Sequence, residues 1–208
     1  MGIDLNQTTT YEHNKADSDF IDRQILNINY LDIESQIQPV ADKQLWLDYD
    51  IQGIQTTYKE ILEMVHFLKE SSIQKWCDLG AGYGRLGFVV GVICQPSEFI
   101  GIEYAQLRVN EGNRLYERMN LSQCRLVQAD LADEHLDLPL SEVYFIYDFG
   151  SHADVEIVLK KLQVIATCQK IVVIARGRAV RRWILSDYPW LGQVNSPQHF
   201  ENWSVFYS

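Results

Sequence analysis

The chain has 208 residues and a mass of 24.1 kDa, which is enough for one folded domain with a sizeable hydrophobic core. Hydrophobic residues make up 47% of it and charged residues 22%, a composition that excludes disordered and collagen-like chains. No apolar run approaches the roughly 18 to 20 residues that a membrane-spanning helix needs. The 28 acidic and 18 basic residues give a net charge of −10, which argues against general binding to nucleic acid.

The cysteines and histidines are scattered along the chain and form none of the motifs of disulfide-rich, redox or metal-binding proteins. The four cysteines lie among apolar neighbours and are expected to be reduced core residues. The N-terminus has neither the features of a secretory signal nor the Ser or Thr at position 6 of a myristoylation motif. We therefore expect a cytoplasmic protein with no metal and no membrane partner.

The N-terminal part differs in charge from the rest, because residues 1–60 hold 11 acidic and 4 basic side chains. Residues 1–19 are polar with almost no apolar periodicity, which predicts a disordered or loosely attached tail. Apolar positions between residues 20 and 52 predict one or two short helices that form an N-terminal extension. The main domain is expected to span residues 53–208.

The main domain alternates between apolar strand-like runs and amphipathic helical segments. Strands are expected at residues 73–79, 98–103, 124–129, 143–147 and 171–175, with helices starting near residues 57, 85, 105 and 151. Such alternation is typical of an α/β fold with a doubly wound, mostly parallel sheet. Two aromatic-rich runs, 188–195 and 200–207, predict an antiparallel hairpin at the C-terminal end of this sheet.

A glycine-rich loop follows the first expected strand. Its sequence, Trp76-Cys-Asp-Leu-Gly-Ala-Gly-Tyr-Gly-Arg-Leu-Gly87, places glycines where the backbone must turn tightly and approach a ligand closely. The second half also satisfies G-x-G-x-x-G, so a nicotinamide or flavin dinucleotide is one possible ligand. The loop therefore predicts a nucleotide-type binding site.

Two carboxylates near this loop favour a different ligand. Asp78 at the end of the strand would repel a pyrophosphate but suits the ammonium and sulfonium groups of S-adenosylmethionine. Glu103 ends the next expected strand, 25 residues later, which is the range in which an acid reaches a ribose diol. Both ligands contain this diol, so only Asp78 discriminates between them.

These residues resemble the D-x-G-x-G-x-G loop and the strand-end acids of the class I S-adenosylmethionine-dependent methyltransferases. Asp78, Gly80, Gly82 and Gly84 match the loop, Glu103 matches the second-strand acid, and Asp130 matches the third-strand acid. The resemblance covers about residues 53–208 and implies a seven-stranded, Rossmann-like fold. It implies that the loop lies against the methionine end, Glu103 binds the ribose and Asp130 addresses the adenine amino group. The cofactor-binding residues expected in this way are Thr57, Asp78, Gly80, Ala81, Gly82, Gly84, Glu103, Tyr104, Asp130, Leu131 and Tyr147.

Within that family, the segment Tyr49–Thr57 looks like the Thr-rich segment ahead of the first helix in the non-SET lysine methyltransferases. This likeness implies that Thr56 and Thr57 approach the cofactor carboxylate. Thr57 is equally expected as the N-cap of the helix that follows, where Glu60 completes a capping box.

The segment after the fourth expected strand, Tyr147-Asp-Phe-Gly150, should face the transferred group. Amino methyltransferases of the family often carry D/N-P-P-Y/F here, and this chain lacks the prolines. Asp148 and Phe149 are expected to orient the acceptor and pack the methyl group. His152 is a candidate general base, and a solvent-exposed first-turn residue is the alternative.

The basic run after the fifth strand begins with Arg176 and Arg178. These arginines are expected either to be an ion-paired helix face or to meet an acidic protein or small-molecule acceptor. The sequence thus predicts methyl transfer to an amine, most plainly a protein lysine. A small-molecule O- or N-methyltransferase, a non-catalytic S-adenosylmethionine-binding protein and an NAD-dependent oxidoreductase remain alternatives.

Overall fold

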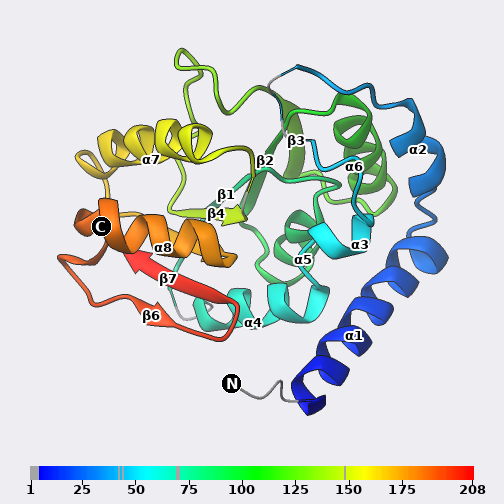
Figure 1. The fold of residues 1–208 in the computed structure, drawn as a ribbon, viewed down its shortest axis with the longest axis horizontal. Coiled ribbons are helices and arrows are strands. Elements are labelled where there is room, and N and C mark those ends of the chain that lie inside the picture. Colours follow the sequence, from blue (N-terminus) through cyan, green and yellow to red (C-terminus); the bar gives the residue numbers. More distant parts are fainter. Residues whose placement is uncertain (1–4, 42, 44, 69–70, 148) are drawn as a thin grey trace.

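A seven-stranded mixed sheet forms the centre of the molecule (Figure 1). The computed structural model describes residues 5–41, 43, 45–68, 71–147 and 149–208. The strands are β1 (Lys75–Leu79), β2 (Glu98–Glu103), β3 (Cys124–Gln128), β4 (Val143–Tyr147), β5 (Val172–Arg176), β6 (Gln198–His199) and β7 (Trp203–Tyr207). Their order in the sheet is β3-β2-β1-β4-β5-β7-β6. The first five are parallel and β7 is antiparallel to both neighbours, so the predicted sheet with a C-terminal antiparallel pair is confirmed.

Helices cover both faces of this sheet. They are α1 (Leu5–Phe20), η1 (Ile21–Ile25), α2 (Tyr30–Gln36), α3 (Ile51–Ile54), α4 (Tyr58–Leu68), α5 (Arg85–Ile93), α6 (Gln106–Arg118), α7 (His152–Ala166), α8 (Arg178–Asp187) and η2 (Pro189–Gly192). None of the helices in the described ranges is long and apolar enough to cross a membrane.

The parallel strands β1, β2, β4 and β5 are buried along most of their length because helices cover both of their faces, whereas the edge strand β3 has exposed residues. Alternate side chains such as Trp76, Phe99 and Val143 pack with α4, α5 and α6 in one hydrophobic cluster. Their neighbours along the strands, such as Leu79 and Ile146, pack with α7 and α8 in a second cluster. The first cluster also takes in side chains from residues 26–30, so the N-terminal segment adds to the core.

Two segments differ from the sequence-based expectation. Residues 5–20 form α1 where a loosely attached tail was expected, and Ser18 near its end accepts a hydrogen bond from Tyr58 N at 3.1 Å. Residues 188–195 contain a 3₁₀ turn where a strand was expected. Pro189 explains this turn, because proline lacks the N–H that a strand ladder needs and suits the first position of a helix. The hairpin therefore pairs β7 with β6, which has only two residues.

Candidate functional site

A cavity of about 360 Å³ lies at the carboxyl ends of β1, β2 and β4, the edge at which doubly wound sheets bind ligands. Of the cofactor-binding and catalytic residues expected from the sequence, those that line this cavity are Asp78, Gly80, Ala81, Gly82, Glu103, Tyr104, Asp130, Leu131, Tyr147 and Phe149. Thr57, Gly84 and His152 are not among the lining residues. Asp148 lies outside the described residues, so its expected role stays a prediction.

The glycine loop turns sharply into the cavity after β1. Gly80 and Gly82 have φ angles of 94° and 55°, in the left-handed region that favours glycine. A Cβ atom on Gly82 would meet nothing within 4 Å, because this residue faces the open cavity. A Cβ atom on Gly84, by contrast, would collide with the Tyr116 hydroxyl, so this glycine is needed for packing against α6.

Asp78 supplies a buried carboxyl group at the start of this loop. Its residue is 5% exposed, and burial followed by the nearby Glu103 charge raises its pKa from 3.8 to about 8. Among the described residues its carboxyl group has no hydrogen-bond or ion-pair partner, and the residue lines the cavity. A buried carboxyl group with a raised pKa and no charged partner favours a cationic ligand group, because a nearby positive charge would stabilise the ionised carboxylate.

Glu103 is the last residue of β2, the strand next to β1. Asp78 pairs in register with Gly101, two residues before Glu103, so the two acids lie close to the same edge of the sheet. Its carboxylate accepts the N–H of Gly82 at 2.9 Å and the N–H of Ala105 at 2.8 Å. The Arg108 guanidinium lies 3.8 Å away. Each carboxylate oxygen has a second lone pair, so Glu103 retains acceptor capacity toward a diol in the cavity.

Asp130 forms the far end of the cavity, after β3. One carboxylate oxygen accepts the N–H of Ala132 at 2.9 Å, and the other pairs with Lys43 at 2.5 Å. The Lys43 ammonium also lies 5.8 Å from the centre of the Tyr104 ring. One oxygen of Asp130 thus holds the turn after β3, whereas the other faces Lys43, a residue that the sequence analysis did not include in the site.

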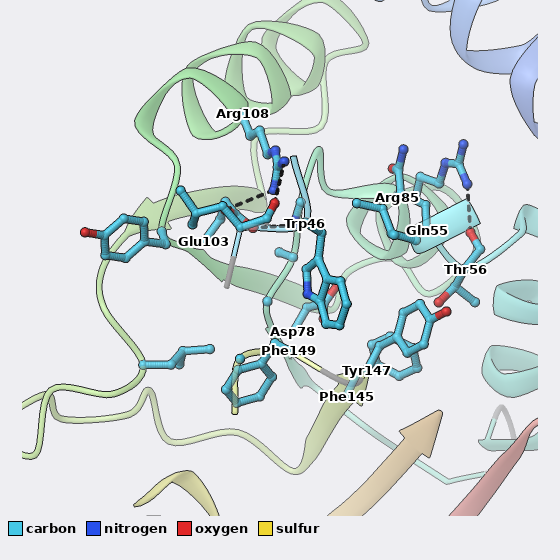
Figure 2. Close-up of a pocket in the computed structure, with 18 of the residues that line it drawn as sticks. Trp46, Gln55, Thr56, Asp78, Arg85, Glu103, Arg108, Phe145, Tyr147 and Phe149 are labelled. Atoms are coloured by element: carbon cyan, nitrogen blue, oxygen red, sulfur yellow. Dashed lines mark hydrogen bonds and ion pairs between the residues drawn. The ribbon is translucent and has the colours of Figure 1, made fainter. Parts of the chain in front are cut away.

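Aromatic side chains gather at the end of the cavity next to β4. Figure 2 shows Trp46, Phe145, Tyr147 and Phe149 around Asp78. The Tyr147 ring is held from behind by the Arg176 guanidinium, 4.2 Å from its centre. This end of the cavity is thus lined largely by aromatic side chains, and the expected packing of Phe149 against the methyl group stays a prediction.

His152 and Thr57 lie outside this cavity lining. The His152 ring packs on Trp183 with ring centres 4.4 Å apart, and its side chain is 51% exposed. Thr57 is buried and accepts the N–H of Glu60 at 3.3 Å, so it caps α4 as the alternative interpretation had it. Its neighbour Thr56 lines the cavity.

Arg176 does not have the substrate-facing position that was one expectation for it. It is 4% exposed and pairs with Glu60 at 2.9 Å, so its charge is neutralised inside the protein. The expectation that Arg176 meets an acceptor is therefore wrong, because the guanidinium supports Tyr147 instead. Arg178, two residues later, is exposed and lines a shallow groove on α8.

The N-terminal segment provides lining residues that sequence reasoning missed. They are Lys43, Leu45, Trp46, Tyr49, Ile51, Gly53, Ile54 and Gln55. In this segment, the family resemblance had placed only Thr56 and Thr57 near the cofactor. Arg85 and Arg108 were also missed, since an arginine in a helix gives no indication of which ligand or carboxylate it faces.

A buried polar network holds this N-terminal segment against α5. Asp22 is fully buried and accepts hydrogen bonds from Tyr30 at 2.6 Å and Tyr58 at 2.8 Å. It also pairs with Arg85, which in turn donates to Thr56 O at 3.0 Å (Figure 2). Arg85 therefore connects the buried network to the cavity wall.

No family model and no curated protein matches the sequence. The solved structures that match in fold include an RNA methyltransferase from Salinibacter ruber in complex with S-adenosyl-L-homocysteine, with a TM-score of 0.51 and 18% identity over 74% of this chain and 92% of that one. TrmN from Thermus thermophilus matches with a TM-score of 0.53 and 11% identity over 73% of this chain and 48% of that one. A candidate O-methyltransferase from Nostoc punctiforme PCC 73102 has a TM-score of 0.54 and 13% identity over 73% of this chain and 56% of that one.

The chain thus spans only about half the length of two of these three proteins. At such low identities the likeness concerns the fold. In strand order, in the antiparallel C-terminal pair and in the position of the glycine loop, the chain has the fold of the class I S-adenosylmethionine-dependent methyltransferases.

Proposed function

We propose that the chain is an S-adenosylmethionine-dependent methyltransferase and that its acceptor is an amine, the side chain of a protein lysine. The observation that carries the proposal is the placement of Asp78 and Glu103 on either side of the Gly80–Gly82 turn in one cavity. One carboxyl group suits a cation and the other suits a diol, which is the combination that this cofactor presents.

The residues present fit the cofactor. Gly82 leaves open space that a larger side chain would fill, and its φ angle disfavours any other residue. Gly80, Gly82 and Asp78 would hold the methionine end, Glu103 the ribose, and Asp130 with Leu131 the adenine. A dinucleotide fits less well, because its pyrophosphate would add negative charge next to Asp78 and Glu103.

When bound, the cofactor supplies an electrophilic methyl group on a sulfonium that is a good leaving group. The chain then has to position the acceptor and exclude water. Trp46, Tyr147 and Phe149 line the cavity there with aromatic surface that suits the aliphatic stem of a lysine. A hydroxyl acceptor would call for a stronger base than an amine does, and the described residues at this end include no histidine.

The acceptor's flanking residues are part of the proposal. Arg178 and Arg182 are exposed, make no ion pair with a described residue and line one groove with Arg181, Leu185 and Ser186. Two arginines four residues apart on a helix repel each other, and an acidic segment next to the target lysine would relieve this repulsion. The four cysteines are free thiols, which supports a reducing compartment, and we place the reaction in the cytoplasm.

The test is transfer of an isotopically labelled methyl group from the cofactor to short synthetic peptides. A peptide with one lysine flanked by glutamates should become labelled, and the same peptide with arginine in place of the lysine should not. An Arg178→Gln/Arg182→Gln variant should raise the KM for the acidic peptide and leave a glutamine-flanked peptide unaffected. Labelling of neither lysine peptide by a protein that binds the cofactor would contradict the lysine assignment.

A further inference from the structure

We infer that Arg108 is a positioning residue for the cofactor: it orients Glu103 and fixes Trp46 over the cavity through the backbone of Leu45. This inference rests on the proposed function, because it concerns how the proposed cofactor is held. Arg108 lies on α6, outside the glycine loop and outside the strand ends that carry the family resemblance.

The Arg108 guanidinium is shared between the cofactor wall and the N-terminal segment. Its Nε and Nη2 donate to the two carboxylate oxygens of Glu34 on α2 at 2.9 and 2.7 Å. Nη2 also donates to the carbonyl oxygen of Leu45 at 3.1 Å, and Nη1 lies 3.8 Å from Glu103 (Figure 2). With 5% of its surface exposed, Arg108 makes these contacts with little competition from water.

The contact with Leu45 decides where Trp46 lies. Trp46 has a φ angle of 57°, a left-handed conformation that a non-glycine residue adopts only when its surroundings hold it. Its predecessor is held by the Arg108 hydrogen bond, and its own ring packs edge-on against Tyr49 with centres 5.5 Å apart. The indole thereby takes its place in the cavity lining, above Asp78 in Figure 2.

The contact with Glu103 has an electrostatic role. Glu103 and Asp78 are two buried carboxyl groups on adjacent strands, so negative charge is concentrated at this end of the sheet. The Arg108 guanidinium, 3.8 Å from Glu103, places a compensating positive charge on the Glu103 side. A charged Glu103 is the stronger acceptor for a diol, so Arg108 should affect cofactor affinity through Glu103.

The alternative is that Arg108 only clamps α2 onto the domain. A pure clamp would change the stability of the fold but neither the affinity of folded protein nor the environment of Trp46. The same helix offers a matched control, because Arg114 and Glu111 form an exposed ion pair at 2.7 Å that lies outside the cavity lining.

The experiment compares Arg108→Gln, Arg108→Lys, Glu34→Gln and the control Arg114→Gln. Calorimetry measures the affinity for S-adenosyl-L-homocysteine, thermal melting measures stability, and acrylamide quenching of fluorescence measures the exposure of Trp46. Trp46→Phe in each background isolates the Trp46 emission from that of the other four tryptophans. The double variant Glu34→Gln/Arg108→Gln removes both charges and keeps the test informative if Arg108→Gln folds poorly.

We expect Arg108→Gln and the double variant to weaken binding by about three- to thirtyfold and to expose Trp46 to the quencher. Arg108→Lys keeps the charge but not the two-pronged geometry, so it should retain part of the affinity. Glu34→Gln leaves Arg108 beside Glu103 and should have the smaller effect on affinity. Arg114→Gln should change neither measurement.

Unchanged affinity and unchanged Trp46 quenching in folded Arg108→Gln or in the double variant would overturn the inference. Arg108 would then only hold α2 against the domain. The quenching measurement needs no cofactor. If the wild-type protein binds no S-adenosyl-L-homocysteine, the proposed function fails, and the quenching data alone still decide whether Arg108 fixes Trp46.

Discussion

The two walls of the cavity are built in different ways. The strand-end wall consists of Asp78, Gly80–Gly82, Glu103 and Tyr104, which end β1 and β2 or follow them directly and present backbone N–H groups and carboxylates. The N-terminal wall consists of residues 45–56, which have little regular structure and are held by arginines from α5 and α6. The first wall is determined by local turns and the sheet, whereas the second depends on hydrogen bonds from arginines far away in the sequence to its backbone carbonyl groups.

This difference has a consequence for how substitutions act. A change in the strand-end wall should alter binding while the fold remains, because the sheet stands independently of the ligand space. A change in the arginines should affect stability first, because Arg85 lies against the buried carboxylate of Asp22 and Arg108 lies 3.8 Å from that of Glu103.

The largest effect is expected for Arg85→Met, which leaves Asp22 as an uncompensated buried charge. Breaking a buried pair in this way costs about 3 to 5 kcal/mol of unfolding free energy. Chemical denaturation measures it, with Arg114→Met on the exposed pair of α6 as the control, for which we expect at most about 1 kcal/mol. Adding Asp22→Asn should recover part of the loss. Equal losses for both single variants would show that the network does not hold the N-terminal wall.

In the strand-end wall, Gly82→Val should abolish binding of S-adenosylmethionine, a loss of about 100-fold or more, because the branched side chain enters the ligand space at a positive φ. Circular dichroism should show an intact fold. Gly84→Ala provides the contrast, since its Cβ would collide with Tyr116 and should lower the melting temperature instead. Normal binding by the Gly82→Val protein would contradict the assignment of the glycine loop to the cofactor site.

The pH dependence of stability sharpens the assignment of Asp78. Its pKa is raised to about 8 in the folded protein from an ordinary value near 3.8, so the folded state holds a proton that the unfolded state releases. The stabilisation that this proton provides is complete below pH 4 and is lost as the pH rises from about 4 to about 8. Melting curves of wild type and Asp78→Asn should therefore diverge across this range, with the wild type losing stability relative to the variant. Parallel pH profiles would contradict the raised pKa.

The smallest effect is expected for His152→Ala. The ring lies on Trp183 rather than in the cavity lining, so the rate of methyl transfer should stay unchanged while stability falls slightly. Steady-state kinetics with the lysine peptide measure it. A large fall in kcat with normal cofactor affinity would restore His152 as a base.

Sequence reasoning predicted the parallel strands and the strand-end acids because these depend on local patterns. β2 and β4 have the expected bounds, and the glycine loop, Glu103 and Asp130 line one cavity. Short apolar runs indicate buried strands and glycines indicate turns, and both signals depend only on neighbouring residues in the sequence.

The N-terminal wall was beyond such reasoning. Trp46 lines the cavity only because Leu45 is held by Arg108, a residue 63 positions away. Arg176 was expected at the acceptor and is paired with Glu60, 116 positions away. No local pattern indicates which carboxylate an arginine will meet. The polar α1 likewise shows no amphipathic signal and docks through single contacts such as Ser18 with Tyr58.

The central claim is tested most directly by calorimetry of the full chain with S-adenosylmethionine, S-adenosyl-L-homocysteine and NAD. The first two should bind and NAD should not. Glu103→Ala should lose about 1.5 to 3 kcal/mol of binding free energy, since two hydroxyls lose a charged acceptor, whereas Glu98→Ala at the other, exposed end of β2 should bind as wild type does. Binding of NAD in place of S-adenosylmethionine, or full affinity in a folded Glu103→Ala protein, would contradict the account.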